Sequence, residues 1–268
     1  MTNPETVPHA ERAPVRKNKA RQNQIADLIL GEGSMTAQEL AEMFGVSVMT
    51  IHRDLDELER QGVLRKARGV ATALPSGVFE ARVAFRHATA IEHKRRIAQA
   101  ALRHVEPGMS VMLDDSTTVL HMVPGLAEYA PLHVATNFMA ALKDLTALPD
   151  IRVIGIGGDY DPLHDSFQGM HAIEVIKAIH ADVLFMSTSA VAAGHAYHQE
   201  ERIVAFKRAM IGSASVRYLL VDSSKLDKTA LHGLAPLSVF DLVITDSEAS
   251  PQALDALEAA GATVEVAS

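Results

Sequence analysis

Residues 36–69, "TAQELAEMFGVSVMTIHRDLDELERQGVLRKARG", predict two short helices joined by a glycine turn and followed by a basic segment. The first helix follows Thr36, an N-cap residue with Glu39 three positions on, as in a capping box, and it ends at Gly45. The second helix follows Ser47, another N-cap candidate, and stops at Gly62. Its apolar face, which predicts packing on a core, carries Val48, Ile51, Leu55 and Leu58.

A further helix precedes this pair, because Ile25, Leu28 and Ile29 recur at helical spacing. After the pair, residues 63–74, "VLRKARGVATAL", have the composition of strands. Three short helices followed by a basic strand segment are the outline of a winged helix-turn-helix, in which the third helix enters the major groove of DNA. A three-helix protein-interaction module with solvated charges has the same outline and is the alternative.

In a winged helix-turn-helix, exposed positions near the start of the third helix read the bases. Arg53 could bond a guanine bidentately, and Thr50 could contact a thymine methyl group or a phosphate. Basic residues of the wing would neutralise phosphates. The predicted DNA-binding residues are Thr36, Ser47, Met49, Thr50, His52, Arg53, Arg65, Lys66 and Arg68.

The net charge of -8 arises entirely after residue 76. Residues 1–76 hold ten of the 25 Lys/Arg and ten of the 33 Asp/Glu residues, so this region is neutral. Its basic residues cluster at 12–21 and at 65–68. A neutral region with two basic edges is compatible with contact to a phosphate backbone.

Length and composition indicate a compact protein of two domains, since 48% of the 268 residues are hydrophobic and 22% are charged. The absence of cysteine excludes disulfides and thiolate metal sites. No run of 18 apolar residues occurs, and residues 1–20 lack the apolar core of a signal peptide. We therefore expect a cytoplasmic protein with no membrane contact, no metal and no cofactor.

Beyond the Pro-Ser-Gly break at 75–77, strand-like runs alternate with helical patterns. Helices are predicted at 92–104, 117–129, 138–147, near 170–179, 200–213 and 251–260. Strands are predicted at 110–114, 132–135, 151–156, 182–186, 217–221 and 242–245, with a last short strand at the end. This alternation predicts an α/β domain with a mostly parallel sheet. The predicted parts are a flexible basic arm (1–19), a winged helix-turn-helix domain (20–74), a linker (75–91) and an α/β domain (92–268).

Ligands of parallel sheets bind beyond the carboxyl ends of the strands, and four loops there are chemically equipped. They are "DDSTT" at 114–118, "TN" at 136–137, "GIGGDYDP" at 155–162 and "VDSSKLDKTAL" at 221–231. The first opens a helix, where free backbone N–H groups favour a phosphate. Each loop alone has an ordinary explanation: Ser116 or Thr117 as a helix cap, Gly157 and Gly158 as a turn, Lys225 as a solvated charge. Their shared position after strands favours a common binding site.

The helix-turn-helix resembles that of the DeoR family of bacterial repressors, whose recognition helix reads close to "VSxxTIRRDLxxLExxGxLxRxHGG". The matching residues are Val46, Ser47, Thr50, Ile51, Arg53, Asp54, Leu55, Leu58, Glu59, Gly62 and Leu64. Two departures are His52, where the family usually has arginine, and "ARGV" in place of "HGG" in the wing. Because histidine is mostly neutral at pH 7, we expect His52 to alter the operator sequence or weaken a phosphate contact.

The resemblance extends over roughly residues 20–246, through "KRRIAQAALRHVEPGMSVMLDDSTTVLHMVPGL" and the later "DSFQG", "AFKRAMI", "DSSK" and "APLSVFDLVITD". It implies that the second domain is similar to ribose-5-phosphate isomerase and the CoA-transferases and senses phosphorylated sugars or related metabolites. "DDSTT" stands where the family has "DSGTT", and the added carboxylate would repel a nearby phosphate but could accept bonds from sugar hydroxyls. The implied effector-binding residues are Asp114, Asp115, Ser116, Thr117, Thr118, Asn137, Gly157, Gly158, Lys207, Asp222 and Lys225.

We therefore predict a metabolite-responsive repressor of a carbohydrate-catabolic operon that binds double-stranded operator DNA as a dimer or tetramer, since paired half-sites require at least two copies. The alternative is a sugar-phosphate isomerase-like enzyme with an appended DNA-binding domain. Its acid–base groups would be Asp114, Asp115, Lys207 and Glu200. A metal at His195 and His198 lacks a clear third ligand, and a purely structural DNA-binding protein leaves the polar loops without a task.

Overall fold

The computed structural model describes residue 18 and residues 21–26, 28–29, 33–67, 69–73, 86–87 and 89–268. The chain divides into two compact units, Met1–Pro75 and Ser76–Ser268. Most of the predicted arm and of the predicted linker, and Arg68 of the wing, lie outside the described residues. Within those described ranges, no helix is long and apolar enough to cross a membrane.

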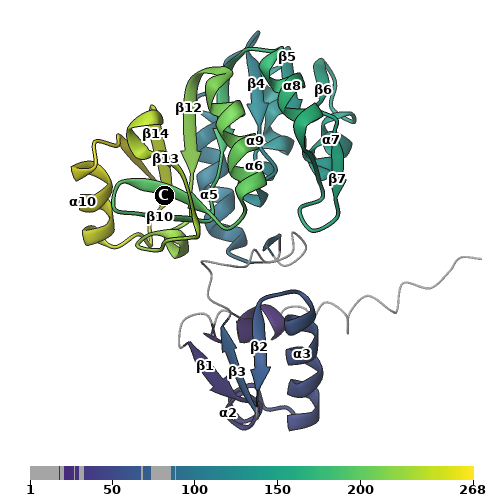
Figure 1. Ribbon diagram of the computed structural model, residues 1–268, viewed down its shortest axis with the longest axis vertical. Helices are drawn as coiled ribbons and strands as arrows, with labels where there is room; N and C mark the ends of the chain where they lie inside the picture. Colours follow the sequence, from purple (N-terminus) through teal and green to yellow (C-terminus); the bar gives the residue numbers. More distant parts are fainter. Residues whose placement is uncertain are drawn as a thin grey trace, which may run out of the picture. The chain divides into compact units, whose positions relative to one another are not determined.

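The first unit is a winged helix-turn-helix, as Figure 1 shows. Residues 21–26 and 28–29 are helical, and α2 (Ala37–Phe44) and α3 (Val48–Arg60) follow them. The wing consists of the antiparallel strands β2 (Leu64–Ala67) and β3 (Val70–Ala73). A further strand, β1 (Ser34–Thr36), pairs with the other edge of β3. The sequence pattern did not predict β1, because three residues are too few to show a period of two.

Both predicted helix caps are present. Thr36 Oγ1 accepts a hydrogen bond from Glu39 N at 3.2 Å, and the Glu39 carboxylate accepts one from Thr36 N at 2.7 Å, so the capping box is complete. Gly45 ends α2 in the left-handed conformation, and Ser47 Oγ accepts from Thr50 N at 3.2 Å. The apolar faces of the helices form the core, with Ile25, Ile29, Leu40, Ile51, Leu55 and Leu58 all buried.

The second unit is built on a seven-stranded parallel sheet with the strand order β15-β14-β12-β9-β4-β5-β6. The strands are β4 (Ser110–Leu113), β5 (Leu132–Thr136), β6 (Ile151–Gly155), β9 (Ala181–Met186), β12 (Ala214–Leu220), β14 (Leu242–Asp246) and β15 (Val264–Ala267). The chain builds outward from β4 to β6, returns to the centre at β9 and then builds in the other direction. The strand order therefore reverses between β4 and β9, and open α/β sheets bind ligands at this switch point.

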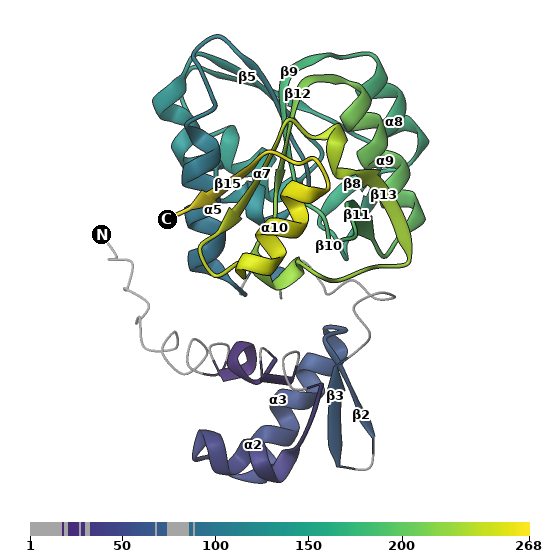
Figure 2. The same ribbon diagram turned by 90° about the vertical axis from the view of Figure 1, so that its left-hand side faces the viewer.

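Helices cover both faces of this sheet. Successive residues of a strand point to opposite faces, and both sets of side chains are apolar, so each face packs against helices. Val111, Leu113 and Val183 pack on the face of α5 (Ile91–Leu102), α6 (Thr117–Leu120), the 3-10 helix η2 (Val123–Tyr129) and α7 (Met139–Leu145). Met112 and Leu184 pack on the face of α8 (Met170–Lys177), α9 (Glu201–Gly212) and α10 (Pro251–Ala259). Figure 2 shows α5 and α9 on opposite sides of the sheet. Burial of both faces explains the nearly continuous apolar runs in the strands.

Short elements depart from the sequence prediction. The predicted helix at 117–129 is divided into α6 and η2, and Pro124, which lacks an N–H group, lies in the first turn of η2. Two antiparallel sheets were not predicted. They consist of β7 (Asp159–Asp161) with β8 (Ser166–Gln168), and of β10 (Ala190–Ala192), β11 (His195–His198) and β13 (His232–Pro236). The remaining elements are the 3-10 helices η3 (Ser223–Lys225) and η4 (Leu237–Val239).

Candidate functional site

The exposed side of α3 carries the side chains predicted to read bases. Met49 is 63% exposed, Arg53 is exposed, and Thr50 and His52 are half-buried. The neighbouring Asp54 does not pair with Arg53. Its buried carboxylate instead accepts hydrogen bonds at 2.6 Å from Arg21 Nε and at 2.9 Å from Gln22 Nε2. The Arg53 guanidinium is therefore available to a ligand on this side of the helix.

The wing presents its two described basic residues differently. Arg65 is exposed on β2, whereas the Lys66 ammonium forms an ion pair with Asp56 of α3. Lys66 is held further by its backbone N–H, which donates to Glu59 Oε1 at 2.7 Å. The charge of Lys66 is thus compensated within the protein, which makes Arg65 the stronger candidate for a phosphate contact.

Thr36 and Ser47, also predicted to contact DNA, both act as helix N-caps. Thr36 Oγ1 donates to Glu39 Oε2 at 2.8 Å, and the hydrogen bonds from the backbone and side chain of Thr36 lower the pKa of Glu39. Ser47 Oγ lies 2.9 Å from Thr50 Oγ1. Both hydroxyls thus position the helices, and their contact with DNA stays a prediction.

At the switch point, Asp114 joins the loop after β4 to the loop after β9. Its Oδ2 accepts from Ser187 N at 2.9 Å, its Oδ1 accepts from Ser116 N at 3.0 Å, and its own N–H donates to Phe185 O at 3.2 Å. Lys207 of α9 forms an ion pair with Asp114 and donates to Ser187 O at 3.1 Å. Asp114 is fully buried and organises these loops, and its contact with an effector stays a prediction.

Asp115, next to this ion pair, is held in its charged form. Its Oδ1 lies 3.6 Å from Lys207 Nζ, and its Oδ2 accepts a hydrogen bond from Ser166 Oγ at 2.7 Å. Burial alone would raise the pKa of Asp115, but Lys207, His164 and Ser166 outweigh burial and lower it to about 2. Burial would lower the pKa of Lys207, yet Asp114 and Asp115 raise it above its ordinary value. Both Asp115 and Lys207 are therefore charged at neutral pH.

The loop after β12 supplies a second lysine. Lys225 Nζ lies 3.4 Å from Ser187 Oγ and 3.7 Å from Asp222 Oδ2. Burial would raise the pKa of Asp222, but Lys225 and a hydrogen bond from Ser224 hold it below its usual range. The Lys225 side chain is 24% exposed, whereas that of Lys207 is 4% exposed. Of the two lysines, Lys225 is thus the one that a ligand can reach.

A small cavity lies between these loops, at the carboxyl ends of the strands. Its volume of about 20 Å³ is the space of one water-sized sphere. The predicted effector-binding residues that line it are Asp115, Ser116, Thr117, Lys207 and Lys225.

The other predicted effector-binding residues lie outside this lining. Asp114 and Asp222 are buried behind it, and the buried Thr118 Oγ1 has no hydrogen-bond partner among the described residues. Asn137 Nδ2 donates to Phe167 O at 2.9 Å, which ties the loop after β5 to β8. Gly157 and Gly158 follow β6. A Cβ on Gly158 would lie 2.4 Å from Gln168 O, so this glycine allows a close backbone approach to β8.

Six lining residues were not predicted from the sequence. Ser187, Thr188 and Ser189 follow β9 directly, so the rule that selected the other four loops, polar residues after a strand, also applies to them. His198 was considered only together with His195, but His195 is exposed while His198 is buried. No local pattern marks the other two, which come from the segment before α5 and from the β7–β8 loop. The six are Arg86, His164, Ser187, Thr188, Ser189 and His198.

Arg86 is held at both its backbone and its side chain. Its carbonyl oxygen accepts a hydrogen bond from Thr117 Oγ1 at 3.3 Å and another from the ammonium of the buried Lys94. Lys94 Nζ also donates to Thr89 O at 2.9 Å. The Arg86 guanidinium reaches His164, with 3.3 Å between Arg86 Nη2 and His164 Nδ1. These bonds tie the segment before α5 to the cavity.

Behind His164 lies an ion-pair network. His164 Nε2 is 2.7 Å from Glu200 Oε1, and Arg202 donates to Glu200 Oε2 at 3.0 Å and pairs with Asp161. The hydrogen bond from His164 is the largest cause that lowers the pKa of Glu200 to about 2. Asp161, His164 and Glu200 each offer a ligand atom within 4.8 Å of the others, a spacing that could hold a metal ion. The Arg202 guanidinium pairs with both carboxylates, and His164 contacts Glu200, so the three residues also form an ion-pair network without a metal.

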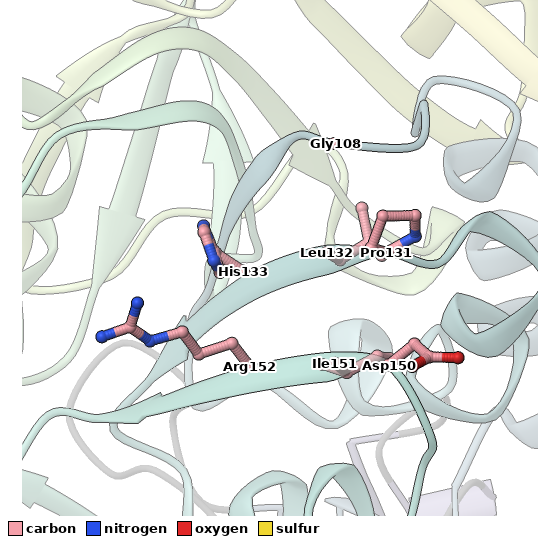
Figure 3. Close-up of a pocket in the computed structure, with 7 residues that line it drawn as sticks. All are labelled: Gly108, Pro131, Leu132, His133, Asp150, Ile151 and Arg152. Carbon is pink, nitrogen blue, oxygen red and sulfur yellow. The ribbon is translucent and has the colours of Figure 1, made fainter.

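A larger groove of about 570 Å³ lies at the opposite, amino ends of β4, β5 and β6. Figure 3 shows His133 and Arg152 on its adjacent strands, where the two residues are partners in the register. No serine or threonine lines this groove, whose other lining residues are Gly108, Pro131, Leu132, Asp150 and Ile151. The smaller cavity at the switch point is therefore the candidate ligand site.

Each of the two units matches a known protein family. Residues 21–76 match the DeoR-like helix-turn-helix domain, and residues 89–247 match the DeoR C terminal sensor domain. The glycerol-3-phosphate regulon repressor of Escherichia coli (strain K12) is 30% identical over 86% of this chain and 92% of its own. The lactose phosphotransferase system repressor of Staphylococcus epidermidis is 29% identical over 85% of this chain and 91% of its own. A ribose 5-phosphate isomerase from Methanocaldococcus jannaschii has 16% identity and a TM-score of 0.37, over 51% of this chain and 55% of its own.

Proposed function

Because this chain belongs to the DeoR family of transcriptional regulators, we propose that it represses a carbohydrate-catabolic operon and leaves its operator when a phosphorylated sugar or related metabolite binds. Its relatives include repressors of a glycerol-3-phosphate regulon and of a lactose phosphotransferase system. One observation carries the proposal: the cavity at the switch point gathers hydroxyl groups with the cationic side chains of Arg86 and Lys225. Phosphate oxygens accept their strongest hydrogen bonds from such cationic donors.

The site is better suited to binding than to isomerisation. The acid–base groups that an isomerase would need are engaged in ion pairs, with Asp114 bound to Lys207 and Glu200 bound to Arg202. General acid–base catalysis works best when the pKa of the group is near the operating pH. The pKa values of Asp115 and Glu200 are lowered to about 2, which makes both poor proton carriers at neutral pH.

An operator-release screen tests this function. Operator DNA is first selected from random duplexes with the purified protein, and its affinity is then followed by fluorescence anisotropy. We expect at least one phosphorylated sugar to weaken operator binding by about 5- to 150-fold, the usual range of allosteric coupling, and its unphosphorylated parent to have no effect. If no phosphorylated compound changes the affinity, the proposal is wrong. Turnover of ribose 5-phosphate by the purified protein would instead support the isomerase alternative.

We further propose that the protein acts on its operator in the cytoplasm as a dimer or tetramer. A helix-turn-helix that reads paired half-sites needs at least two copies, related by the symmetry of the site. Sedimentation velocity of the full chain with and without operator measures this directly. A monomer bound to a single half-site would contradict it.

A further inference from the structure

We infer that Arg86 binds the anionic group of the effector and thereby links occupancy of the cavity to the segment that leads from the DNA-binding unit. This inference rests on the proposed function and adds to it a residue and a route of coupling. Arg86 lies between Pro75, where the first unit ends, and α5, where the regular structure of the second unit begins. Arg86 lines the cavity, and its guanidinium lies 3.3 Å from the imidazole of His164, another lining residue.

Charge at the cavity makes Arg86 necessary for an anionic ligand. The lysines account for two of the three nearby carboxylates, Lys207 with Asp114 and Lys225 with Asp222. The third carboxylate, Asp115, would leave the site with an excess negative charge if Arg86 were absent. Like charges repel strongly where burial excludes water, so a phosphate would not enter such a site. With Arg86, the three positive charges of these two lysines and this arginine equal the three negative charges of the three aspartates.

The size of the cavity indicates that Arg86 moves when a ligand binds. A volume of about 20 Å³ holds one water, which is too little for a phosphate. Lys207, which lines the cavity, is fixed by its buried ion pair with Asp114. The Arg86 guanidinium faces an imidazole nitrogen of His164, and a phosphate group is the better partner because it offers charge and bidentate geometry. An entering phosphate therefore draws the guanidinium from His164 and opens the cavity.

The Thr117 hydroxyl extends this response to the backbone. Thr117 lines the cavity, and its hydroxyl donates to the carbonyl oxygen of Arg86. A hydroxyl group has one hydrogen to donate, so it cannot donate to a phosphate and to this carbonyl at the same time. Ligand binding thus alters the contact of the Arg86 guanidinium with His164 and the contact of the Arg86 carbonyl oxygen with Thr117. The segment joined to the DNA-binding unit responds to the occupied site in this way.

The test uses the full chain with inorganic phosphate as the minimal probe, and titration calorimetry measures its Kd. Arg86→Gln removes the charge, Arg86→Lys keeps the charge without the bidentate geometry, and Arg95→Gln is the control. Arg95 lies exposed on α5 in a surface pair with Glu92. We expect Arg86→Gln to raise the Kd by about ten- to a hundredfold, the cost of losing a hydrogen bond to a charged group. Arg86→Lys should give a smaller rise, and Arg95→Gln should match the wild type.

The outcomes separate this inference from the proposed function. If the wild type binds phosphate and both Arg86 variants bind it equally well, Arg86 is not an anion ligand, and the sensor function stands. If the wild type binds neither phosphate nor any phosphorylated sugar, the proposed function fails and the inference fails with it. Melting temperatures of the variants identify any loss of folding. If Arg86→Gln does not fold, the Arg86→Lys comparison decides.

Discussion

The hydroxyl of Thr117 donates a hydrogen bond of 3.3 Å to the backbone carbonyl of Arg86. The bond joins the loop after β4 to the segment that precedes α5. Thr117 has no capping task, because Ser116 Oγ caps α6 by accepting from Val119 N at 3.1 Å. With only four residues, α6 has a weak dipole, so the positive potential at the cavity comes from side chains.

Replacing Thr117 tests whether its hydroxyl takes part in effector binding. Thr117→Val keeps the shape of the side chain and removes the donor, whereas Thr117→Ser keeps the donor. We expect Thr117→Val to require several times more effector for operator release, and Thr117→Ser to respond nearly as the wild type does. Anisotropy titrations of operator release measure both. An unaltered response in Thr117→Val would show that the hydroxyl only joins the two segments.

Loss of the buried lysine should destabilise the second unit strongly. Lys207→Met leaves the fully buried Asp114 without its partner, and removing one member of a buried pair lowers the free energy of unfolding by about 3–5 kcal/mol. The double variant with Asp114→Asn should recover part of this loss, because the uncompensated charge is gone. Urea unfolding followed by circular dichroism gives the comparison. Lys177→Met, which breaks an exposed pair with Glu174, is the control and should change stability by no more than about 1 kcal/mol.

Stability should depend on acid pH through two lowered carboxyl pKa values. The pKa of Asp115 falls from 3.8 to about 2, and that of Glu200 falls from 4.5 to about 2, so the folded state stabilises the charged form of each carboxyl group. Their contribution to the free energy of unfolding is fully present when the pH is above the ordinary carboxyl pKa values of 3.8 and 4.5. It is lost as the pH falls from about 4.5 toward 2. Urea midpoints measured across this range should therefore fall with pH. Asp115→Asn should show a shallower fall, and an identical slope would remove Asp115 from the acid response.

On α3, Arg53→Ala should reduce affinity for the selected operator by about 1–3 kcal/mol if Arg53 makes a bidentate base contact. Affinity for random DNA should fall less, because a base contact contributes little there. Arg60→Ala provides a matched control, since Arg60 lies at the end of the same helix and pairs with Glu57. Equal losses on operator and random DNA would identify Arg53 as a phosphate contact.

The wing makes a separate prediction about salt dependence. Arg65→Ala should lower the slope of log affinity against log salt by about one, the value for one lost phosphate contact. Lys66→Ala should lower it less, because Asp56 already pairs with the lysine ammonium. Asp56→Asn should strengthen binding to all DNA sequences. A full loss of one unit of slope in Lys66→Ala would mean that the lysine leaves Asp56 when DNA binds.

The sequence by itself determined the classes of both units. Capping residues and helical spacing marked α2 and α3, because N-caps and amphipathic faces are local properties of the chain. The apolar runs separated by helical patterns likewise predicted the parallel sheet, since strands buried on both faces show no polar alternation. The position after strands identified Asp115, Ser116, Thr117 and Lys225 as candidates for one site, and the family resemblance added Lys207, which lies within α9.

Tertiary structure alone decided which charges remain available to ligands. Lys66 of β2 is paired with Asp56, whereas Arg53 of α3 is exposed and its neighbour Asp54 binds Arg21. The sequence pattern does not distinguish these two cations. In the second unit, the return of the chain to β9 beside β4 brings distant segments to one cavity. Arg86 and His164 meet there although 78 positions separate them. Such meetings depend on strand order and crossover connections, which local patterns of polarity do not encode, and so the residues that complete the site appear only in the folded chain.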